Sequence, residues 1–185
     1  SHAKLARLLA GELTLPGLPL AQDRRWSAVA QLNRHAAPAS RERIAAELKR
    51  DNSRRGQTEA IRAEVLRPEW ETKKPWLDKI ASPDAGLSLA DQRTAMQSLF
   101  PYEQARFHRR FSGDYFSWLK ALAPVRPNEF LESFAEQLVP ATCRAEDSAA
   151  LGSFLDANPG LSPVILKELK VARQENGRCI RARAL

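Results

Sequence analysis

The chain has 185 residues, a formal net charge of +7, 43% hydrophobic residues and 28% charged residues. This composition is typical of a folded globular protein and excludes a largely disordered chain. No segment reaches the roughly 20 uncharged apolar residues that a membrane-spanning helix needs. We therefore expect one domain over residues 1–185, with no membrane partner.

The chain opens with SHAKLARLLAGEL, in which Lys4, Arg7 and Glu12 interrupt the apolar run. This pattern does not fit a secretory leader. Because the segment begins inside a helical pattern and without an initiating methionine, we expect a piece of a longer chain. Residues 1–3 then include residues left from cloning.

Apolar residues recur at spacings of three and four along the chain, and no segment keeps the alternation of a strand. Proline- and glycine-containing turns end each helical segment. They lie at 16–19, 35–40, 66–68, 81–86, 123–128, 139–142 and 157–163. The pattern predicts an all-α protein of about ten short helices, with about 35–45 residues in each helix pair. We expect an irregular α-solenoid of paired antiparallel helices, similar to HEAT or armadillo repeats and part of a larger domain; a compact bundle is the alternative.

Local signals place several helix ends. Ser88 followed by Asp91 resembles a capping box. Asn128 is expected as the N-cap of a helix over Glu129–Leu138, and Ser162 as the N-cap of the last helix, with Pro163 in its first turn. Pro75 predicts either a helix start near it or a kink in a helix that begins at Glu69.

The helix predicted over Glu129–Leu138 has an apolar face and an acidic face. Glu129, Glu132 and Glu136 share the acidic face. Neighbouring carboxylates need burial or a metal ion to acquire a pKa suited to acid–base catalysis. We expect an exposed, hydrated face. The residues expected in the core are Phe130, Leu131, Phe134 and Leu138.

The chain ends in the basic segment RQENGRCIRARAL. This segment is either a free basic tail that binds an acidic partner or a helix docked on the rest of the protein. On a helical wheel from Val164 to Arg183, apolar and basic residues separate onto opposite sides. Large buried side chains contribute roughly 1.5–3 kcal/mol each, more than exposed cations do. We predict a docked helix. Its apolar side consists of Ile165, Leu169, Ala172, Cys179 and Ile180, and its basic side of Lys167, Lys170, Arg178 and Arg181.

The segment PYEQARFHRRFSGDYFSWLKAL combines aromatic residues with arginines. Stacking aromatic rings beside Arg106, Arg109 and Arg110 would suit single-stranded nucleic acid. The aromatic spacing favours a core helix instead, and acidic residues interrupt the basic ones, so we expect no nucleic-acid partner. The residues expected in the core are Phe107, Phe111, Tyr115, Trp118 and Leu122.

The chain carries no motif of a complete active site. His2, His35 and His108 are its only histidines; none stands in H-E-x-x-H or has zinc-ligand spacing. A glycine-rich phosphate loop and G-x-S-x-G are also absent. His108 is expected on a surface or in a groove, where nearby arginines disfavour its protonation. We assign no catalytic or metal residue and no cofactor to this chain, and leave substrate-binding residues unassigned.

Cys143 and Cys179 are the two cysteines, 36 positions apart. A framework of disulfides would use more cysteines in a chain of this length. We therefore expect two reduced thiols, buried or half-buried, and a cytoplasmic protein.

An ordered series of segments resembles one known family. The segments are DRRWSAVAQL, IAAELKRDNSRRGQTEAIRAEVLRP, WLDKI, DYFSWLKAL and VARQENGRCIRARAL. Together they resemble the C-terminal helical domain of zinc aminopeptidases of the aminopeptidase N family, particularly bacterial members. The matching positions are Arg25–Trp26, Ile44–Asp51, Gly56, Ala60, Pro68, Trp76, Tyr115–Phe116 and Arg178–Arg183.

The resemblance implies a parent enzyme that removes N-terminal residues from peptides. In that family a zinc ion bound by H-E-x-x-H and a later glutamate activates water, and these motifs lie upstream of the present segment. The resemblance implies that this chain is noncatalytic, that its partners are the upstream catalytic domain and peptide substrates, and that it walls the chamber over the active site. The alternative is a free-standing helical-repeat module that binds a protein or nucleic acid.

A solenoid cut between repeats exposes an apolar strip at the cut. We therefore expect Leu5, Leu8 and Leu9 to pack on another copy or to leave an apolar patch, so that the chain self-associates through this end.

Overall fold

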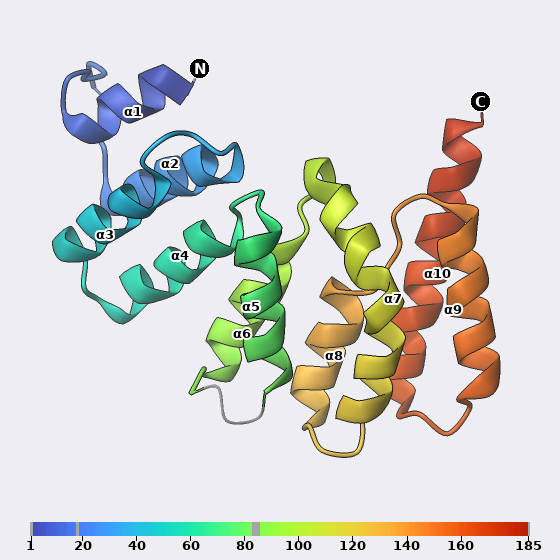
Figure 1. The fold of residues 1–185 in the computed structure, drawn as a ribbon. Helices are drawn as coiled ribbons and strands as arrows, with labels where there is room; N and C mark the ends of the chain where they lie inside the picture. Colours follow the sequence, from blue (N-terminus) through green and yellow to red (C-terminus); the bar gives the residue numbers. More distant parts are fainter. Residues whose placement is uncertain (1, 18, 83–85, 185) are drawn as a thin grey trace. The chain divides into compact units, whose positions relative to one another are not determined.

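The computed structural model describes residues 2–17, 19–82 and 86–184, and the regular secondary structure of these residues is helical (Figure 1). The all-α prediction is confirmed, and the ten helices found among the described residues match the expected number. They form two compact units, residues 1–78 and 79–185. That residues 1–185 act as one domain stays a prediction.

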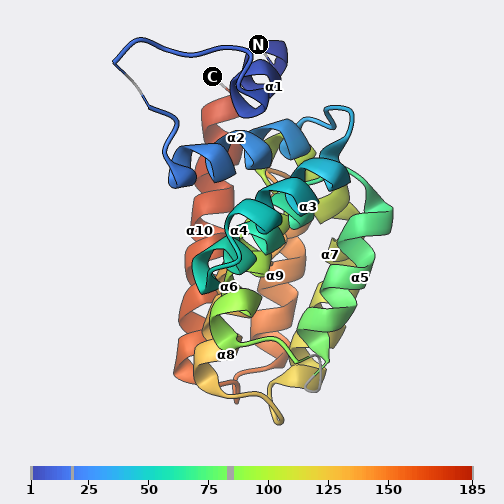
Figure 2. The same cartoon turned by 90° about the vertical axis from the view of Figure 1, so that its left-hand side faces the viewer.

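Unit 1 is built around α2. Helices α1, α3 and α4 pack against it, and a long connection joins α1 to α2 (Figure 2). The helices are α1 (His2–Ala10), α2 (Gln22–Arg34), α3 (Ser40–Arg50), α4 (Arg54–Val65) and α5 (Trp70–Ala81), which begins in this unit. The α2–α4 core consists of Trp26, Val29, Ala30, Ala60, Ala63 and Leu66.

None of the residues in α1 is fully buried. Leu9 packs against the core cluster around Trp26, whereas Leu5 and Leu8 are only half-buried. This helix therefore has one leucine in contact with the core and two that are partly open to solvent. Self-association through α1 stays a prediction.

Helix α5 runs through Pro75 without ending there. It begins at Trp70, one residue after the expected start at Glu69, so the structure excludes a start near Pro75. Proline removes one helical N–H donor. Trp76, Leu77 and Ile80, which follow the proline, are buried, and tertiary packing offsets the missing hydrogen bond.

Unit 2 is a set of helices joined by short connections. The α7–α8 and α9–α10 connections lie at one end of the unit, and the α8–α9 connection lies at the other (Figure 1). Helix α8 contacts α6, α7 and α10, and α10 contacts α9. The elements are α6 (Leu89–Leu99), the 3-10 helix η1 (Tyr102–Gln104), α7 (Ala105–Leu122), α8 (Asn128–Gln137), α9 (Ala145–Ala157) and α10 (Pro163–Arg183).

Within unit 2, α7 and α8 are antiparallel neighbours, and so are α9 and α10, as expected of paired helices in a solenoid. The repeat type stays a prediction.

The predicted helix starts are confirmed in two cases and wrong in one. Ser88 is the N-cap of α6, and its hydroxyl oxygen accepts a hydrogen bond from the Asp91 N–H at 3.2 Å. Ser162 is the N-cap of α10, with Pro163 in the first turn, although its side chain makes no capping bond. Asn128 is not an N-cap: it is the first residue of α8, and Pro127 is the N-cap. Pro127 already has the extended backbone, with ψ of 154°, that an N-cap needs.

The predicted faces of α8 and α10 are confirmed. In α8 the apolar residues expected in the core are buried, and Glu129, Glu132 and Glu136 are exposed. In α10, Ile165 and Leu169 are buried, and the rest of the predicted apolar side is half-buried (Ala172, Cys179 and Ile180). The basic residues expected outside are exposed, so the chain ends in a docked helix. Asn176 departs from the pattern: it is polar and only 2% exposed.

The aromatic segment of α7 forms core, as expected. Phe107, Phe111, Tyr115 and Leu122 are buried and Trp118 is half-buried. The three arginines considered for nucleic-acid binding, Arg106, Arg109 and Arg110, are exposed.

Candidate functional site

Cys143 and Cys179 form a disulfide, with their Cα atoms 5.3 Å apart. The prediction of two reduced thiols is therefore wrong, although both residues are half-buried as expected. The reason is tertiary. Helix α10 returns alongside α9, so a residue just before α9 meets a residue near the end of α10. The number of cysteines carries no information about this proximity.

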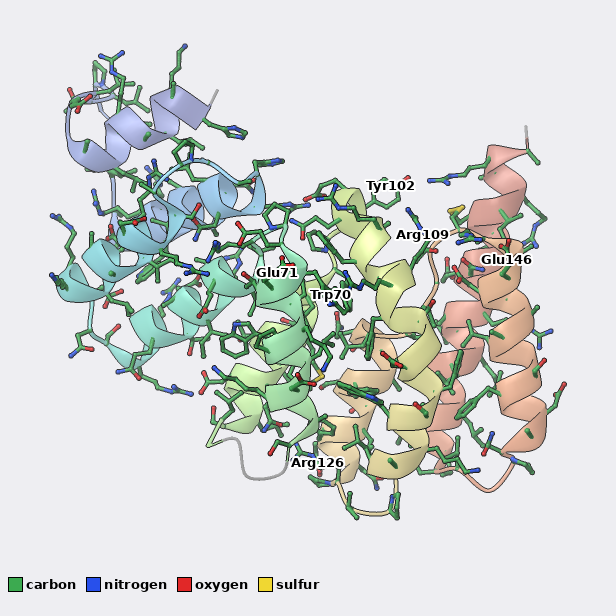
Figure 3. All side chains as sticks on the ribbon, in the orientation of Figure 1. Trp70, Glu71, Tyr102, Arg109, Arg126 and Glu146 are labelled. Carbon is green, nitrogen blue, oxygen red and sulfur yellow. A yellow bond between two sulfur atoms is a disulfide. The ribbon has the colours of Figure 1, made fainter. Side chains whose placement is uncertain are left out.

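The disulfide lies in the wall of a groove in unit 2 with a volume of about 740 Å³, which we call the disulfide groove. Its walls come from the start of α7 with η1, the α8–α9 connection, and α10. In Figure 3 the Tyr102 and Arg109 side chains extend into the space between α7 and α10. The apolar part of the lining consists of Phe100, Ala105, Val139, Ala141, Val171 and Ala172.

Two large side chains at the disulfide groove remain open to solvent. Tyr102 is 75% exposed and Val171 is 43% exposed. The Arg183 side chain, near the end of α10, donates a hydrogen bond to the Tyr102 hydroxyl. Residues from η1 and α10 therefore meet across the groove.

Charged residues of both signs line the disulfide groove. Arg109 and Arg183 contribute positive charge, and four glutamates contribute negative charge. Glu168 pairs with Lys167 at 3.1 Å, and Glu175 pairs with Arg178 at 2.5 Å. Basic residues on α10 therefore partly neutralise the acidic side of the groove. The four glutamates are Glu103, Glu136, Glu168 and Glu175.

His108 lies at the disulfide groove, which agrees with the expected surface or groove position. Its ring stacks on Phe100 with centroids 4.6 Å apart, and Nε2 lies 2.9 Å from the Leu138 carbonyl oxygen. Because a carbonyl can only accept, Nε2 carries the proton and donates. Burial lowers the pKa of His108, against the opposing effects of the Leu138 carbonyl and Asp147. Desolvation, rather than the neighbouring arginines, is thus the main cause.

A pH prediction follows from the lowered pKa of His108. Because the pKa of His108 is lowered in the folded protein, its imidazole stays neutral to a lower pH than in the unfolded chain, where it binds a proton below about pH 6.5. The stability of unit 2 should therefore be full above that pH and decrease as the pH falls toward the folded pKa. His108→Gln, which keeps a donor for Leu138, should flatten this dependence in urea unfolding between pH 7.5 and 5.5. His35→Gln, at an exposed position, should leave it unchanged; equal slopes in wild type and His108→Gln would contradict the prediction.

The α8–α9 connection is held by hydrogen bonds as well as by the disulfide. Cys143 has a left-handed backbone, with φ of 64°, and its N–H donates to Asn176 Oδ1 at 2.7 Å. Asn176 Nδ2 donates to the Arg144 carbonyl at 2.8 Å and to Ser148 Oγ at 2.7 Å. Asn176 thus provides hydrogen-bond partners for polar groups of the connection that would otherwise be buried without a partner.

The sequence alone did not predict a role for Asn176. The available signal was a single polar residue close to the apolar stripe of the last helix, between Ala172 and Ile180. Such a residue is retained in a core when it has hydrogen-bond partners.

Unit 1 contains a separate buried polar network. Arg25 donates to both carboxylate oxygens of Glu47, at 2.8 Å each, and Gln22 donates to Glu47 at 2.7 Å. Arg25 also donates to the Leu9 carbonyl at 3.2 Å, which links α1 to α2. Glu47 is 3% exposed. Burial raises the pKa of Glu47, but the hydrogen bonds from Arg25 and Gln22 and the charges of Arg25 and Arg50 outweigh it, and the pKa lies below its usual value.

Several residues that carry the family resemblance meet at one place in unit 1. Trp26 Nε1 donates to Asp51 Oδ2 at 2.9 Å, and Ser53, the N-cap of α4, accepts from the Gly56 N–H at 3.0 Å. A Cβ atom on residue 56 would lie 2.1 Å from the Asp51 carbonyl oxygen, so glycine is required there. These residues hold the α3–α4 turn against α2. Their contacts are structural, since none of them brings together groups for catalysis.

The sequence matches no protein-family model and no curated protein. Across residues 2–17, 19–82 and 86–184, no cluster of three or more His, Cys, Asp or Glu side chains is placed to hold a metal ion. Within the same described residues, no helix is both long and apolar enough to cross a bilayer. What the disulfide groove offers chemically is a disulfide, an exposed aromatic ring and charges of both signs.

Proposed function

We propose that this chain is a noncatalytic C-terminal helical part of an aminopeptidase N-family zinc metallopeptidase. The parent enzyme removes N-terminal residues from peptides, and this part walls the chamber over the active site and restricts access to it. Its partners are the upstream catalytic domain and, through the parent enzyme, peptide substrates.

The observation that carries the proposal is the ordered series of motifs, three residues of which have definite structural contacts in unit 1. Trp26, Asp51 and Gly56 come from three of the matching positions, and they meet at the α3–α4 turn. Motif residues that serve packing suit a supporting domain. The zinc ligands and the base belong upstream, so no residue of this chain receives a catalytic role.

A prediction about metal and activity tests the proposal. The purified chain should bind no stoichiometric zinc and hydrolyse no peptide, whereas the full-length protein should contain H-E-x-x-H and a later glutamate upstream and act as a zinc-dependent aminopeptidase. Metal analysis and release of N-terminal residues from peptides measure this. As the matched control, the full-length enzyme with its metal removed should lose activity and regain it with zinc.

Either of two results would reject the proposal: an upstream reading frame without H-E-x-x-H, or peptide hydrolysis by the isolated chain. In the full-length enzyme, deletion of this part should leave hydrolysis of a small amino-acid amide and change the dependence of the rate on peptide length.

The alternative, a free-standing helical-repeat module, receives support from the disulfide groove, where Tyr102 and Val171 are exposed. Exposed apolar side chains at a groove suit a protein partner better than nucleic acid. Tight, salt-dependent binding of the chain to DNA would favour the nucleic-acid version of this alternative.

The proposal includes a cytoplasmic location. Reduced thiols do not support this location, because the two cysteines form a disulfide. In the cytoplasm, disulfides of proteins are usually transient and redox-active.

A further inference from the structure

The Cys143–Cys179 disulfide faces a space that a small molecule can enter. Both cysteines are half-buried and line the disulfide groove, whose volume of about 740 Å³ lies within the range of small-molecule sites, about 300–1,000 Å³. The exposed Tyr102 and Val171 side chains at the groove show that it opens to solvent.

The backbone around Cys143 keeps its position through hydrogen bonds that do not involve sulfur. The N–H and hydroxyl of Thr142 both donate to Asp147 Oδ2 at 2.7 Å. On the other side of the cysteine, the Arg144 carbonyl accepts from Asn176, which also accepts from the Cys143 N–H. The residue before Cys143, Cys143 itself and the residue after it are therefore each held.

Without the disulfide, Cys179 is positioned by the helix that carries it, α10. It lies one helical turn beyond Asn176, the residue that holds the α8–α9 connection. Further back, Ile165 and Leu169 anchor α10 in the core, with 1% and 0% exposure. Breaking the bond between the sulfurs therefore leaves both backbone positions supported.

We propose that Cys143 and Cys179 form a reversible thiol-exchange site, open through the disulfide groove to small thiols, in which the reduced protein keeps its fold. This inference is independent of the proposed aminopeptidase function. It stands on the place of both half-buried cysteines in the lining of the disulfide groove, on the hydrogen bonds around Cys143, and on the docked helix that carries Cys179.

The exchange takes place in two balanced steps. A thiolate from the small thiol attacks one sulfur, a new mixed disulfide forms, and the other cysteine leaves as a thiolate. A second thiolate then attacks the mixed disulfide, which releases the oxidised small molecule and the second cysteine thiolate. The protein disulfide gains two electrons, and two molecules of small thiol lose one each.

The reverse reaction should be efficient because the two cysteines stay close. A Cα separation of 5.3 Å falls within the range of disulfides, about 4.4–6.8 Å. Once one cysteine carries a mixed disulfide, the other attacks it within the same molecule, at high effective concentration.

The main experiment uses the full chain in buffers of reduced and oxidised glutathione at a series of ratios, without denaturant. Free thiols are counted by alkylation and mass spectrometry, and helix content is followed by circular dichroism. We expect two thiols to appear together, unchanged helix content, and return of the Cys143–Cys179 bond when oxidised glutathione is in excess. Release of thiols only in denaturant, or loss of helix on reduction, would overturn the proposal.

Two single-cysteine variants test access directly. Cys179→Ser and Cys143→Ser each leave one thiol, and each folded variant is incubated with oxidised glutathione. A mixed disulfide on at least one of them supports the proposal. No mixed disulfide on either, while the denatured variants react, shows that the groove does not admit the thiol and rejects it.

A third variant tests the positioning role of Asn176. Asn176→Ala should keep the disulfide in the oxidised protein but slow its re-formation after reduction by about tenfold, since the connection loses two hydrogen bonds and α9 loses a third. Gln174→Ala, an exposed position on the same helix, is the matched control and should re-form the bond at the wild-type rate. Equal rates in both variants would contradict the positioning argument. If Asn176→Ala does not fold, the single-cysteine variants decide the proposal.

Discussion

Replacement of Phe134 by alanine should destabilise unit 2 by about 3–5 kcal/mol, the usual effect of removing a buried phenylalanine ring. Phe134 has 0% exposure in α8. Its ring stacks on Tyr115 of α7 with centroids 5.5 Å apart and lies 5.9 Å from the Phe130 ring. The substitution removes both ring contacts and leaves a cavity between α7 and α8, which rigid neighbours fill only in part.

The measurement is urea unfolding, with hydrogen exchange of the α7 and α8 amides to assign the change to unit 2. Val125→Ala is the control. Because Val125 is 68% exposed, this substitution should lower the free energy of unfolding by no more than about 0.5 kcal/mol. Similar losses in the two variants would mean that α7 and α8 do not share the core described above.

Arg25→Ala should destabilise unit 1 by about 3–5 kcal/mol, because it removes the main partner of a buried carboxylate. Glu47 has 3% side-chain exposure and Arg25 has 13%, and the remaining cation, Arg50, is 3.9 Å from Glu47. The variant also loses the hydrogen bond from Arg25 to the Leu9 carbonyl, so α1 should detach from α2 first.

Two controls separate this effect from a general loss of charge. Arg7→Ala removes an ion pair with 57% and 66% exposed side chains and should change stability by less than about 1 kcal/mol. The double variant Arg25→Met/Glu47→Leu should recover most of the loss, since it leaves no unpaired charge.

Acid should affect unit 1 in a defined direction. The pKa of Glu47 is below its usual value, so its contribution is complete above the unfolded pKa of about 4.3 and is lost as the pH falls through the folded pKa. Hydrogen exchange of the α2 and α3 amides at decreasing pH measures this. Arg25→Ala with wild-type stability, or with an unchanged response to acid, would show that the Arg25–Glu47 pair is not coupled to folding.

Much of the fold was predictable because helix faces are local properties. In α8 the spacing of Phe130, Phe134 and Leu138 identified the buried side, and in α10 that of Ile165 and Leu169 did the same. An apolar residue at every third or fourth position places side chains on one side of a helix whatever the helix later packs against. The Ser88 cap was predictable for a similar reason, since its bond reaches only three residues along the chain.

The predictions that were wrong depend on backbone geometry or on contacts between residues far apart in the sequence. Asn128 has the side chain of a good N-cap, but the helix begins one residue earlier because Pro127 already has the extended backbone of a cap. The arginines adjacent to His108 in the sequence do not cause its lowered pKa. Burial against Phe100 and Leu138 is a property of the packed unit.

The amino-acid sequence by itself determined that this protein is helical, where most of its helices lie and which of their sides are apolar, because each of these follows from residues within a few turns of one another. The tertiary structure alone decided the Cys143–Cys179 bond, the role of Asn176 and the groove that they share. The disulfide and the hydrogen bonds of Asn176 join residues 28 to 36 positions apart. They exist because α10 folds back along α9 and brings its end to the start of that helix.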